Sequence, residues 1–366
     1  MTARTIVVAP DSFKGTATAG EVAQAIADGW RTVRPDDELR LLPMADGGEG
    51  TLDAFEIAVP GAIRHRVTVT GPVGHPVDAS WLELPDGTAV VELAETSGIT
   101  LLDPLQPYAA HTLGFGEAIV AALDHGAERL LLAIGGSAST DGGAGMLTAL
   151  GARLLDADGA CIGLGNAPLS TVRSADLSAA RALPAGGAVI LSDVTNPLLG
   201  TAGAAAVFGP QKGAHAEDVA AMDDNLRAFA SLFDIDASTP GAGAAGGAGF
   251  GLLVWGATIA SGAAGVGEAI GLPDAAHNAA AVVTGEGRYD AQTSGGKVAA
   301  YVAGLAPGRS MLVAGAIQAS TEGLFTAAAS LTELAGGVEG AMAEPLVHLR
   351  SAGAALAASF EASNAD

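Results

Sequence analysis

Apolar residues recur along the chain in short runs, and most of these runs end at a loop rich in glycine. Residues 5–9 form an apolar, partly β-branched run that predicts a buried strand. Thr18 and Glu21 have the spacing of a capping box, which predicts that a helix begins there. A second strand is expected over residues 38–44 and a second helix over about 51–58. This βαβα order predicts a parallel sheet with loops at the carboxyl ends of its strands.

The pattern then changes to one that is typical of antiparallel strands. Residues 63–70 alternate between apolar and polar side chains. Residues 77–84 and 88–94 are also strand-like, and Pro85-Asp86-Gly87 between them is a hairpin signal. A change from βα units to hairpins predicts that a second domain begins near residue 75.

Two short apolar runs late in the chain, residues 281–284 and 311–314, resume the opening pattern, and each leads into a glycine loop. We therefore expect an α/β protein with two domains. The first is discontinuous and covers residues 1–74 and 281–366. The second is a mixed α/β domain inserted over residues 75–280. The segment 338–360 has a helical pattern, with Pro345 as the expected break.

Composition narrows the classes of protein and of partner. An apolar fraction of 49% with 16% charged residues is enough for a large core. The net charge of −23 argues against nucleic acid or an anionic membrane as a partner, because both bind basic surfaces. The single cysteine, Cys161, excludes an intrachain disulfide, and with no apparent signal peptide it favours the cytoplasm. The uncharged segment 237–267 contains Pro240 and ten glycines, so it predicts a packed loop and helix rather than a membrane span.

The cations are distributed in an informative way. The chain has three lysines, and each is adjacent to a glycine: Lys14-Gly15, Lys212-Gly213 and Gly296-Lys297. A flexible ammonium group on a glycine loop can reach a phosphate while the bare backbone approaches it closely. Three solvated surface lysines are the alternative interpretation.

Six loops combine acids, glycines and in some cases a lysine, and most of them follow an apolar strand. They are Asp11-Ser12-Phe13-Lys14-Gly15, Asp46-Gly47-Gly48-Glu49-Gly50, Gly135-Gly136-Ser137 through Asp141-Gly142-Gly143, Ser192-Asp193-Val194-Thr195-Asn196, Gly285-Glu286-Gly287-Arg288-Tyr289-Asp290, and Gly295-Gly296-Lys297. Carboxylates, ammonium groups and backbone amides at one sheet edge are the groups that phosphoryl transfer needs. Taken singly, each loop could instead be a tight turn or a close packing contact.

Several common motifs are absent or incomplete. The chain has no P-loop sequence before a lysine and no G-x-S-x-G elbow. Gly241 to Gly246 matches G-x-G-x-x-G, but the polar residues before it do not predict the strand that a dinucleotide site requires. The seven histidines include no i,i+4 pair and have no cysteines beside them, so we do not expect a zinc site.

The motif loops together resemble the type-1 glycerate kinase family, in order and over residues 5 to about 315. The segments that carry the resemblance are Ala9-Pro10-Asp11-Ser12-Phe13-Lys14-Gly15, Met44-Ala45-Asp46-Gly47-Gly48-Glu49-Gly50-Thr51, Gly135-Gly136-Ser137-Ala138, Asp141-Gly142-Gly143-Ala144-Gly145-Met146, Ser192-Asp193-Val194-Thr195-Asn196-Pro197-Leu198, Phe208-Gly209-Pro210-Gln211-Lys212-Gly213 and Thr284-Gly285-Glu286-Gly287-Arg288. The resemblance implies ATP- and Mg²⁺-dependent phosphorylation of glycerate, in bacterial members chiefly to 2-phosphoglycerate. It also implies a flavodoxin-like domain that carries an inserted α/β domain, with the active site in the cleft between them.

Within that resemblance, residue chemistry suggests roles. Asp193 is expected to be the base that takes the hydroxyl proton, with Lys14 and Lys212 as the other catalytic residues. The expected substrate and nucleotide contacts are Asp11, Ser12, Asp46, Gly47, Gly48, Glu49, Gly135, Gly136, Ser137, Asp141, Asn196, Arg288 and Lys297. The expected metal ligands are Asp46, Glu286 and Asp290. Thr140 is a departure, because the family usually has asparagine there and a hydroxyl loses the second contact of the amide.

Other functions remain open from the residues alone. Phosphorylation could occur at the 3-hydroxyl instead of the 2-hydroxyl. A nicotinamide-dependent hydroxy-acid oxidoreductase that uses Gly241 to Gly246 is a second class of function, and a non-catalytic anion-binding protein is a third. The oligomeric state is not determined, and a homodimer is left open.

Overall fold

The computed structural model describes residues 3–290 and 298–363, and these divide into two compact units. Unit 1 comprises Met1–Asp46, Asp53–Pro60 and Ala263–Asp366, and unit 2 comprises Gly47–Leu52 and Gly61–Gly262. The main part of unit 2 therefore begins at Gly61 and ends at Gly262, whereas the expected inserted domain covers residues 75–280. Strand β3 (Ile63–Thr70) pairs along its whole length with β4 (Pro76–Glu83), so it belongs to unit 2.

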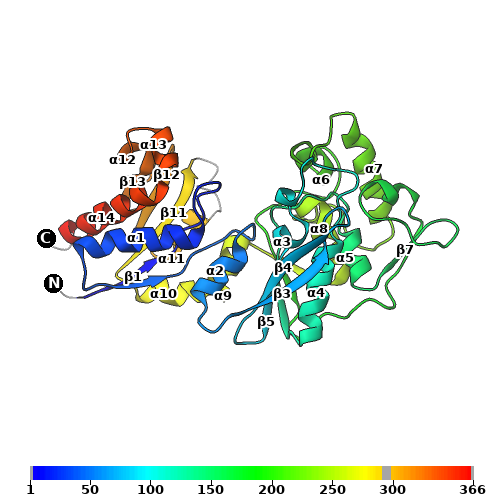
Figure 1. Ribbon diagram of the computed structural model, residues 1–366, viewed down its shortest axis with the longest axis horizontal. Helices are drawn as coiled ribbons and strands as arrows, with labels where there is room; N and C mark the ends of the chain where they lie inside the picture. The colour runs from blue at the N-terminus through cyan, green and yellow to red at the C-terminus, as the bar shows by residue number, and fades with distance from the viewer. Residues whose placement is uncertain (1–2, 291–297, 364–366) are drawn as a thin grey trace. The chain divides into compact units, whose positions relative to one another are not determined.

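Unit 1 is built on a sheet of five parallel strands (Figure 1). In sheet order they are β2 (Glu38–Leu41), β1 (Thr5–Val8), β11 (Ala281–Tyr289), β12 (Ser310–Ile317) and β13 (Ala327–Ser330). Counted along the chain within the unit, this is the order 2-1-3-4-5, which is the flavodoxin-like arrangement. The strand order reverses direction between β1 and β11, the place where folds of this kind bind ligands.

Helices α1 and α14 pack closely against each other in unit 1 and lie side by side in Figure 1. A Cβ atom on Gly29 of α1 would lie 1.9 Å from the carbonyl oxygen of Arg350, so only glycine permits this approach. The expected capping box is present, since Thr18 and Glu21 each bond to the other's backbone. The helices of this unit are α1 (Ala19–Val33), α2 (Thr51–Ala58, with its first two residues in unit 2), α9 (Gly262–Ala269), α10 (Leu272–Asn278), α11 (Val298–Leu305), α12 (Leu331–Leu334), α13 (Val338–Ala343) and α14 (Pro345–Ser363).

Unit 2 is built on a mixed sheet of six strands. Its parallel part consists of β10 (Thr258–Ala260), β9 (Ala188–Leu191), β6 (Arg129–Ala133) and β5 (Thr88–Glu92) in that order. Strands β4 and β3 extend it antiparallel. The expected hairpin at Pro85-Asp86-Gly87 is confirmed, because Leu84 N donates to Thr88 O at 2.8 Å.

The remaining elements of unit 2 surround this sheet. A small antiparallel pair is formed by β7 (Arg153–Leu155) and β8 (Ser174–Asp176). The helices are α3 (Leu93–Ser97), α4 (Leu113–His125), α5 (Ala144–Ala149), α6 (Ala204–Phe208), α7 (Asp218–Ala230) and α8 (Ala248–Trp255), with short 3₁₀ turns η1 (Ile99–Leu101), η2 (Ala167–Thr171), η3 (Pro210–Lys212) and η4 (Ala244–Gly247).

Two local expectations were wrong. The segment 285–289, expected to be a glycine loop, continues strand β11, with Glu286 opposite Ala314 and Arg288 opposite Ala316 of β12. The missing side chain of Gly285 permits this pairing, because a Cβ there would lie 2.7 Å from Val313 O. Residues 93–94, expected to extend a strand, begin helix α3.

The G-x-G-x-x-G segment does not have the setting of a dinucleotide site. Gly241 and Gly243 lie in turns, and the four residues that follow form η4 before helix α8. The residues around the segment are all described, and no strand directly precedes it. Separately, no helix among the described residues has the length and apolarity needed to span a membrane.

Candidate functional site

Three of the expected loops meet at the carboxyl edge of the unit 2 sheet. Gly135, which follows β6, donates its N–H to the carbonyl oxygen of Gly47 at 2.9 Å. Gly47 has φ +85°, and a Cβ on it would lie 2.2 Å from Leu191 O at the end of β9. A Cβ on Gly135 would lie 2.5 Å from the Cα of Gly48. The glycines therefore allow the Gly47–Gly50 backbone to lie directly on the ends of two neighbouring strands.

A buried carboxylate that the sequence reasoning missed holds this loop. Glu92, at the end of β5, is 2% exposed. Its two oxygens accept hydrogen bonds from Gly50 N at 3.1 Å and Leu52 N at 3.0 Å. It thus supplies negative charge at the start of α2, where helix N–H groups lack internal partners. The available signal was a glutamate directly after the apolar run 89–91.

Lys212 lies buried behind the loop that follows β6. Only 3% of it is exposed, and its Nζ donates to Ser137 Oγ at 2.7 Å and to Ser139 O at 2.6 Å. Burial lowers the pKa of the Lys212 ammonium to about 7, and the nearby charge of Asp141 offsets part of that effect. No carboxylate of the described residues lies within ion-pair distance of Lys212. The site therefore holds a cation whose positive charge is only weakly compensated.

Asp141, expected to be a substrate contact, is used inside the fold. It is fully buried and accepts hydrogen bonds from the N–H and hydroxyl of Thr112 and from the N–H groups of Gly143 and Gly145, at 2.8–3.1 Å. These bonds fix the loop that begins α5. The hydroxyls of Ser97, Ser139 and Thr140 are also buried and have no hydrogen-bond partner among the described residues, so this interior retains unused polar groups.

Asp193 follows β9 and is exposed. Its Oδ1 accepts from Ser261 Oγ at 2.7 Å and from Gly262 N at 2.9 Å. Within the described part of the chain, no hydrogen bond reaches its Oδ2. Asn196, an expected substrate contact, holds the loop through its side chain, since its Nδ2 donates to Ala202 O at 2.8 Å. One carboxylate oxygen of Asp193 is therefore held by two hydrogen bonds, and the other accepts none from the described residues.

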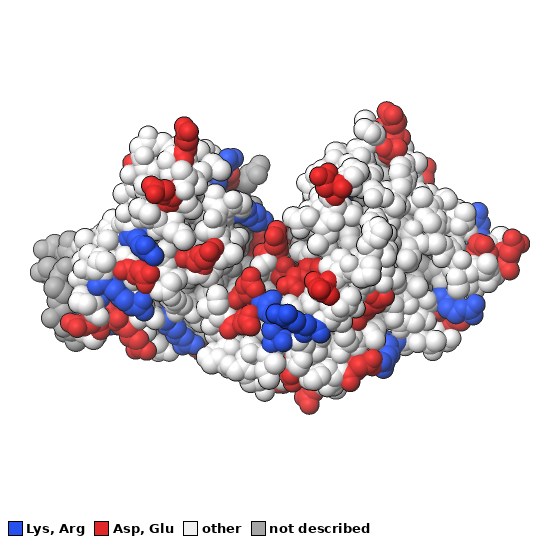
Figure 2. All heavy atoms as spheres, viewed as in Figure 1, with Lys and Arg blue, Asp and Glu red and all other residues white. Residues whose placement is uncertain are grey.

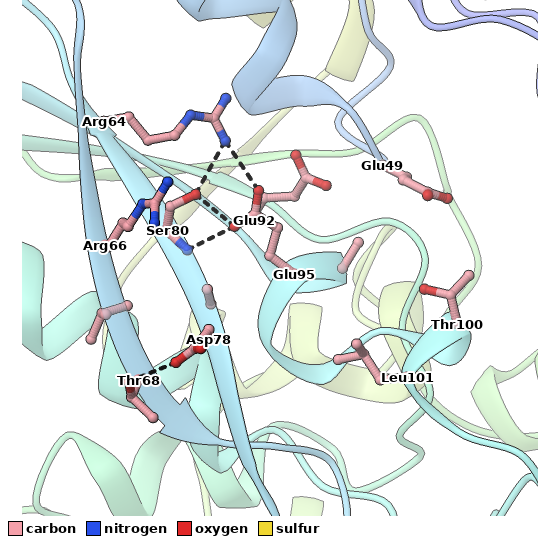
Figure 3. A pocket seen from close by; sticks show the side chains of 13 residues that line it. Glu49, Arg64, Arg66, Thr68, Asp78, Ser80, Glu92, Glu95, Thr100 and Leu101 are labelled. Atoms are coloured by element: carbon pink, nitrogen blue, oxygen red, sulfur yellow. Dashed lines mark hydrogen bonds and ion pairs between the residues drawn. The ribbon is translucent and has the colours of Figure 1, made fainter.

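A hollow of about 700 Å³ in unit 2 includes Glu49 in its lining (Figure 3). Two arginines of β3, Arg64 and Arg66, also line it, and neither was singled out from the sequence. Arg64 lies 3.3 Å from Glu95 and donates to Ser80 Oγ at 3.1 Å, whereas Arg66 is exposed. Strand alternation places both arginines on one face, which was the signal available. Figure 2 shows acidic side chains spread over the visible surface. In a chain of net charge −23, two arginines in one hollow therefore provide a local positive charge that could attract an anion.

In unit 1 the expected acids lie after strands β1 and β2. Asp11 N donates to Gly285 O at 2.8 Å, which places the loop at the reversal of strand order. Burial, and next the charge of Asp46, raise the pKa of the Asp11 carboxyl to about 6. Lys14 is 79% exposed, and its Nζ lies 4.0 Å from Asp46 Oδ2. Ser12 N donates to Asp11 Oδ1 at 2.6 Å.

The other expected residues of unit 1 lie on or just after β11. Glu286 is buried, Arg288 is exposed, and Asp290 is half-buried. Among the described residues, Asp46, Glu286 and Asp290 do not form a group of three whose ligand atoms lie within 4.8 Å of one another. Magnesium commonly uses one or two carboxylates together with substrate phosphates. A site for it therefore does not require that all three acids lie together. Lys297 lies outside the described residues.

Comparisons with known proteins agree on one family. The model of the glycerate kinase family matches residues 6–361. The chain is 44% identical over 311 residues to glycerate 2-kinase of Escherichia coli (strain K12), covering 82% of this chain and 81% of that one. It is 46% identical over 308 residues to glycerate kinase of Bacillus subtilis (strain 168), covering 81% and 80%. A crystal structure named as glycerate kinase 2 from Salmonella typhimurium LT2 superposes with a TM-score of 0.87 at 38% identity, with 100% of each chain covered.

Proposed function

Since the chain belongs to the glycerate kinase family, we propose that it transfers the γ-phosphoryl group of ATP to the 2-hydroxyl of D-glycerate, giving 2-phosphoglycerate and ADP. The choice of the 2-hydroxyl follows the name of the Escherichia coli relative. Transfer to the 3-hydroxyl is the alternative product.

One observation carries the proposal beyond family membership. In unit 2, the loops at Gly47–Gly50, Gly135–Ser137 and Ser192–Asn196 meet at the ends of β6 and β9. They bring backbone N–H groups, a buried lysine and an exposed carboxylate to one sheet edge. Phosphoryl transfer depends mainly on positioning and on stabilising charge, and these are the groups that supply both.

Asp193 is the proposed general base. Its Oδ1 is fixed by Ser261 and Gly262, so the carboxylate is oriented while Oδ2 is left for the proton of the glycerate hydroxyl. As that oxygen attacks the γ-phosphorus, Asp193 accepts its proton and the bond from phosphorus to the ADP oxygen breaks. A fixed carboxylate also loses little conformational freedom on meeting the substrate.

Lys212 and Arg66 are the proposed anion contacts of unit 2. Lys212 lacks a carboxylate partner among the described residues, and an arriving phosphate or carboxylate would favour its charged form. Arg66 lines the same hollow as Glu49, where a guanidinium could pair with the glycerate carboxylate. Lys14 is proposed to contact phosphate from unit 1, and the placement of the site between the two units stays a prediction.

The magnesium ion that the family implies fits the acids of unit 1. Asp11 and Asp46 provide hard carboxylate oxygens close enough for the charge of Asp46 to raise the pKa of Asp11. When bound with ATP, the ion would neutralise charge on the phosphates. A cytoplasmic location and a homodimer likewise remain predictions.

The direct test is an ADP-release assay with the full chain, ATP, Mg²⁺ and D-glycerate, followed by NMR of the product. We expect ADP only when glycerate is present, and a phosphorus–proton coupling at C2 of the product. Coupling at C3 would replace the proposed product with its isomer. If no ADP forms although glycerate binds, the protein is an anion-binding protein; if NADH absorbance changes with a hydroxy acid, it is an oxidoreductase.

A further inference from the structure

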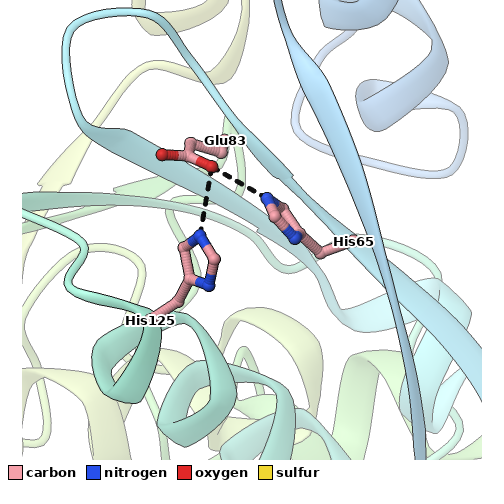
Figure 4. Close-up of side chains that lie close together, drawn as sticks. All are labelled: His65, Glu83 and His125. Carbon is pink, nitrogen blue, oxygen red and sulfur yellow. Dashed lines mark hydrogen bonds and ion pairs between the residues drawn. The ribbon is translucent and has the colours of Figure 1, made fainter.

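Two histidines and a glutamate meet in unit 2, on the face of β3 opposite to that of Arg64 and Arg66. His65 lies on β3, Glu83 on β4 and His125 at the last position of α4 (Figure 4). His65 Nε2 lies 2.8 Å from Glu83 Oε2, and His125 Nε2 lies 3.3 Å from the same oxygen. One donor atom from each residue lies within 4.8 Å of the other two.

The geometry points to a binding site for one divalent transition-metal ion of the zinc class. Two imidazole nitrogens and a carboxylate oxygen are a common protein ligand set for zinc, and an ion bound to them at about 2.0–2.2 Å requires donors about 3.4 Å apart in tetrahedral geometry. The separations of 2.8 Å and 3.3 Å need only small side-chain movements to reach that arrangement. Nitrogen donors disfavour Mg²⁺ and Ca²⁺, which prefer oxygen.

The surroundings fix the two rings and favour a cation. His65 stacks on Trp81 with ring centroids 4.2 Å apart and planes 15° apart, and His125 meets the edge of Trp81 at 5.4 Å. Trp81 is only 3% exposed, so it forms a rigid wall for both imidazoles. A neighbouring hollow of about 400 Å³ is lined by Glu83, Asp86 and Glu128 with no lysine or arginine in its lining. These acids lower the electrostatic cost of placing a divalent ion there.

The site is also accessible to an ion from solution. The side chains of His65, Glu83 and His125 are 25%, 36% and 49% exposed, respectively. With three protein ligands, a fourth position would be left for water or another small ligand. The bound ion would link β3, β4 and the end of α4, so binding should stabilise the folded unit by an amount that rises with the logarithm of the ion concentration above the Kd.

The test uses untagged full-length protein and zinc chloride alone, with binding measured by competition against a chromophoric chelator. We expect one ion per chain, and at least about tenfold weaker binding in His125→Ala and in Glu83→Gln. His75→Ala, which removes an exposed histidine of the same unit outside the cluster, should bind as the wild type does. Thermal unfolding without metal shows that each variant is folded.

A second measurement locates the ion. Cu²⁺ or Ni²⁺ bound to His65 would lie close to Trp81 and quench its fluorescence, and this quenching should disappear in His125→Ala. Bound Co²⁺ should show the strong visible bands of a four-coordinate ion. Wild-type protein that binds no zinc, or equal binding and quenching in His125→Ala, would overturn the proposal. Neither result depends on kinase activity, so the outcome is independent of the proposed function.

Discussion

The two units differ in the charged groups that lie near the carboxyl edges of their sheets. In unit 1, Asp11 and Asp46 lie near each other, and the adjacent lysine, Lys14, is 79% exposed at 4.0 Å from Asp46. In unit 2, the lysine is the buried group: Lys212 is 3% exposed, and its hydrogen-bond partners among the described residues are two neutral oxygens. Unit 1 therefore crowds negative charge, and unit 2 buries positive charge.

The two pKa shifts express the same difference. The pKa of Asp11 rises to about 6 and that of Lys212 falls to about 7, so each group is pushed towards its neutral form. Each shift reflects the free-energy cost of keeping the group charged in its surroundings. A ligand of opposite charge would reduce that cost. Unit 1 is thus suited to a cation and unit 2 to an anion, as the proposed binding of a metal–nucleotide complex and an organic acid requires. Variants at four positions test this contrast.

The largest expected effect is at Asp193. Asp193→Asn keeps an oxygen that can accept from Ser261 and Gly262 but removes the proposed base, so turnover should fall by about 10²–10⁴-fold. ATP binding should be nearly unchanged, because the loop retains its shape. The measurement is kcat from ADP release together with nucleotide affinity by calorimetry. Asp158→Asn, on an exposed turn of the same unit, is the matched control. An unchanged kcat would remove Asp193 from the mechanism.

The next effect tests the buried cation of unit 2. Lys212→Met should lower kcat/KM by about 10²-fold, because the anion loses its charged partner. In the wild type, kcat/KM should fall as the pH rises through about 7, where Lys212 loses its proton in the free enzyme. Lys212→Arg cannot lose its charge, so this basic limb should be absent from its profile even if the rate is low.

Stability gives an independent check on Lys212. Its folded pKa of about 7 lies below the ordinary value, so the unfolded chain binds the extra proton between about pH 7 and 10. Unfolding free energy should therefore rise with pH over that window in the wild type and less steeply in Lys212→Met. The unfolding free energy is measured by denaturant titration at each pH. The same dependence on pH in the wild type and Lys212→Met would mean that Lys212 is not desolvated.

The sequence was sufficient for elements whose signals are local. Thr18 and Glu21 cap α1 as expected, and Pro85-Asp86-Gly87 forms the hairpin, because both depend on residues a few positions apart. The loops at Asp11, Gly47, Gly135 and Asp193 could also be found, since each follows a strand. Parallel pairing then brings the loops of one sheet to a common edge.

What the sequence did not reveal depends on contacts between distant segments. Glu92 meets Leu52, which lies 40 residues earlier, and no local pattern marks that contact. His65 and His125 come together because α4 packs on β3, and histidine spacing along the chain cannot reveal such a contact. Glycines were ambiguous in the same way: Gly285 suggested a loop, but the pairing of β11 with β12 makes it part of a strand.

A smaller effect should appear at the acidic edge of unit 1. Asp11→Asn removes a carboxyl whose folded pKa is raised, and such a group destabilises the protein once the pH exceeds that pKa of about 6. The variant should therefore be more stable than the wild type by about 1–2 kcal/mol at pH 7.5, but not at pH 4. Its activity should fall about tenfold.

Magnesium sharpens this test. Mg²⁺ with ATP should raise the unfolding temperature of the wild type more than that of Asp11→Asn, because the ion relieves carboxylate repulsion only where both acids remain. Asp36→Asn removes an exposed acid of the same unit and should match the wild type throughout. Equal magnesium responses in Asp11→Asn and the wild type would break the proposed contrast between the units.

The smallest expected effect is at Lys14, and there the contrast predicts a separation of function from stability. An ion pair at 4.0 Å with a 79% exposed partner contributes little to folding, so Lys14→Ala should change the unfolding free energy by less than about 0.5 kcal/mol. A flexible ammonium on a glycine loop that contacts phosphate should still matter for catalysis, and we expect kcat/KM for ATP to fall several-fold. Lys14→Arg, which keeps the charge, should recover part of that loss. Wild-type kinetics in Lys14→Ala would show that Lys14 is a solvated surface residue, and the anion contacts would then belong to Lys212 and Arg66 of unit 2.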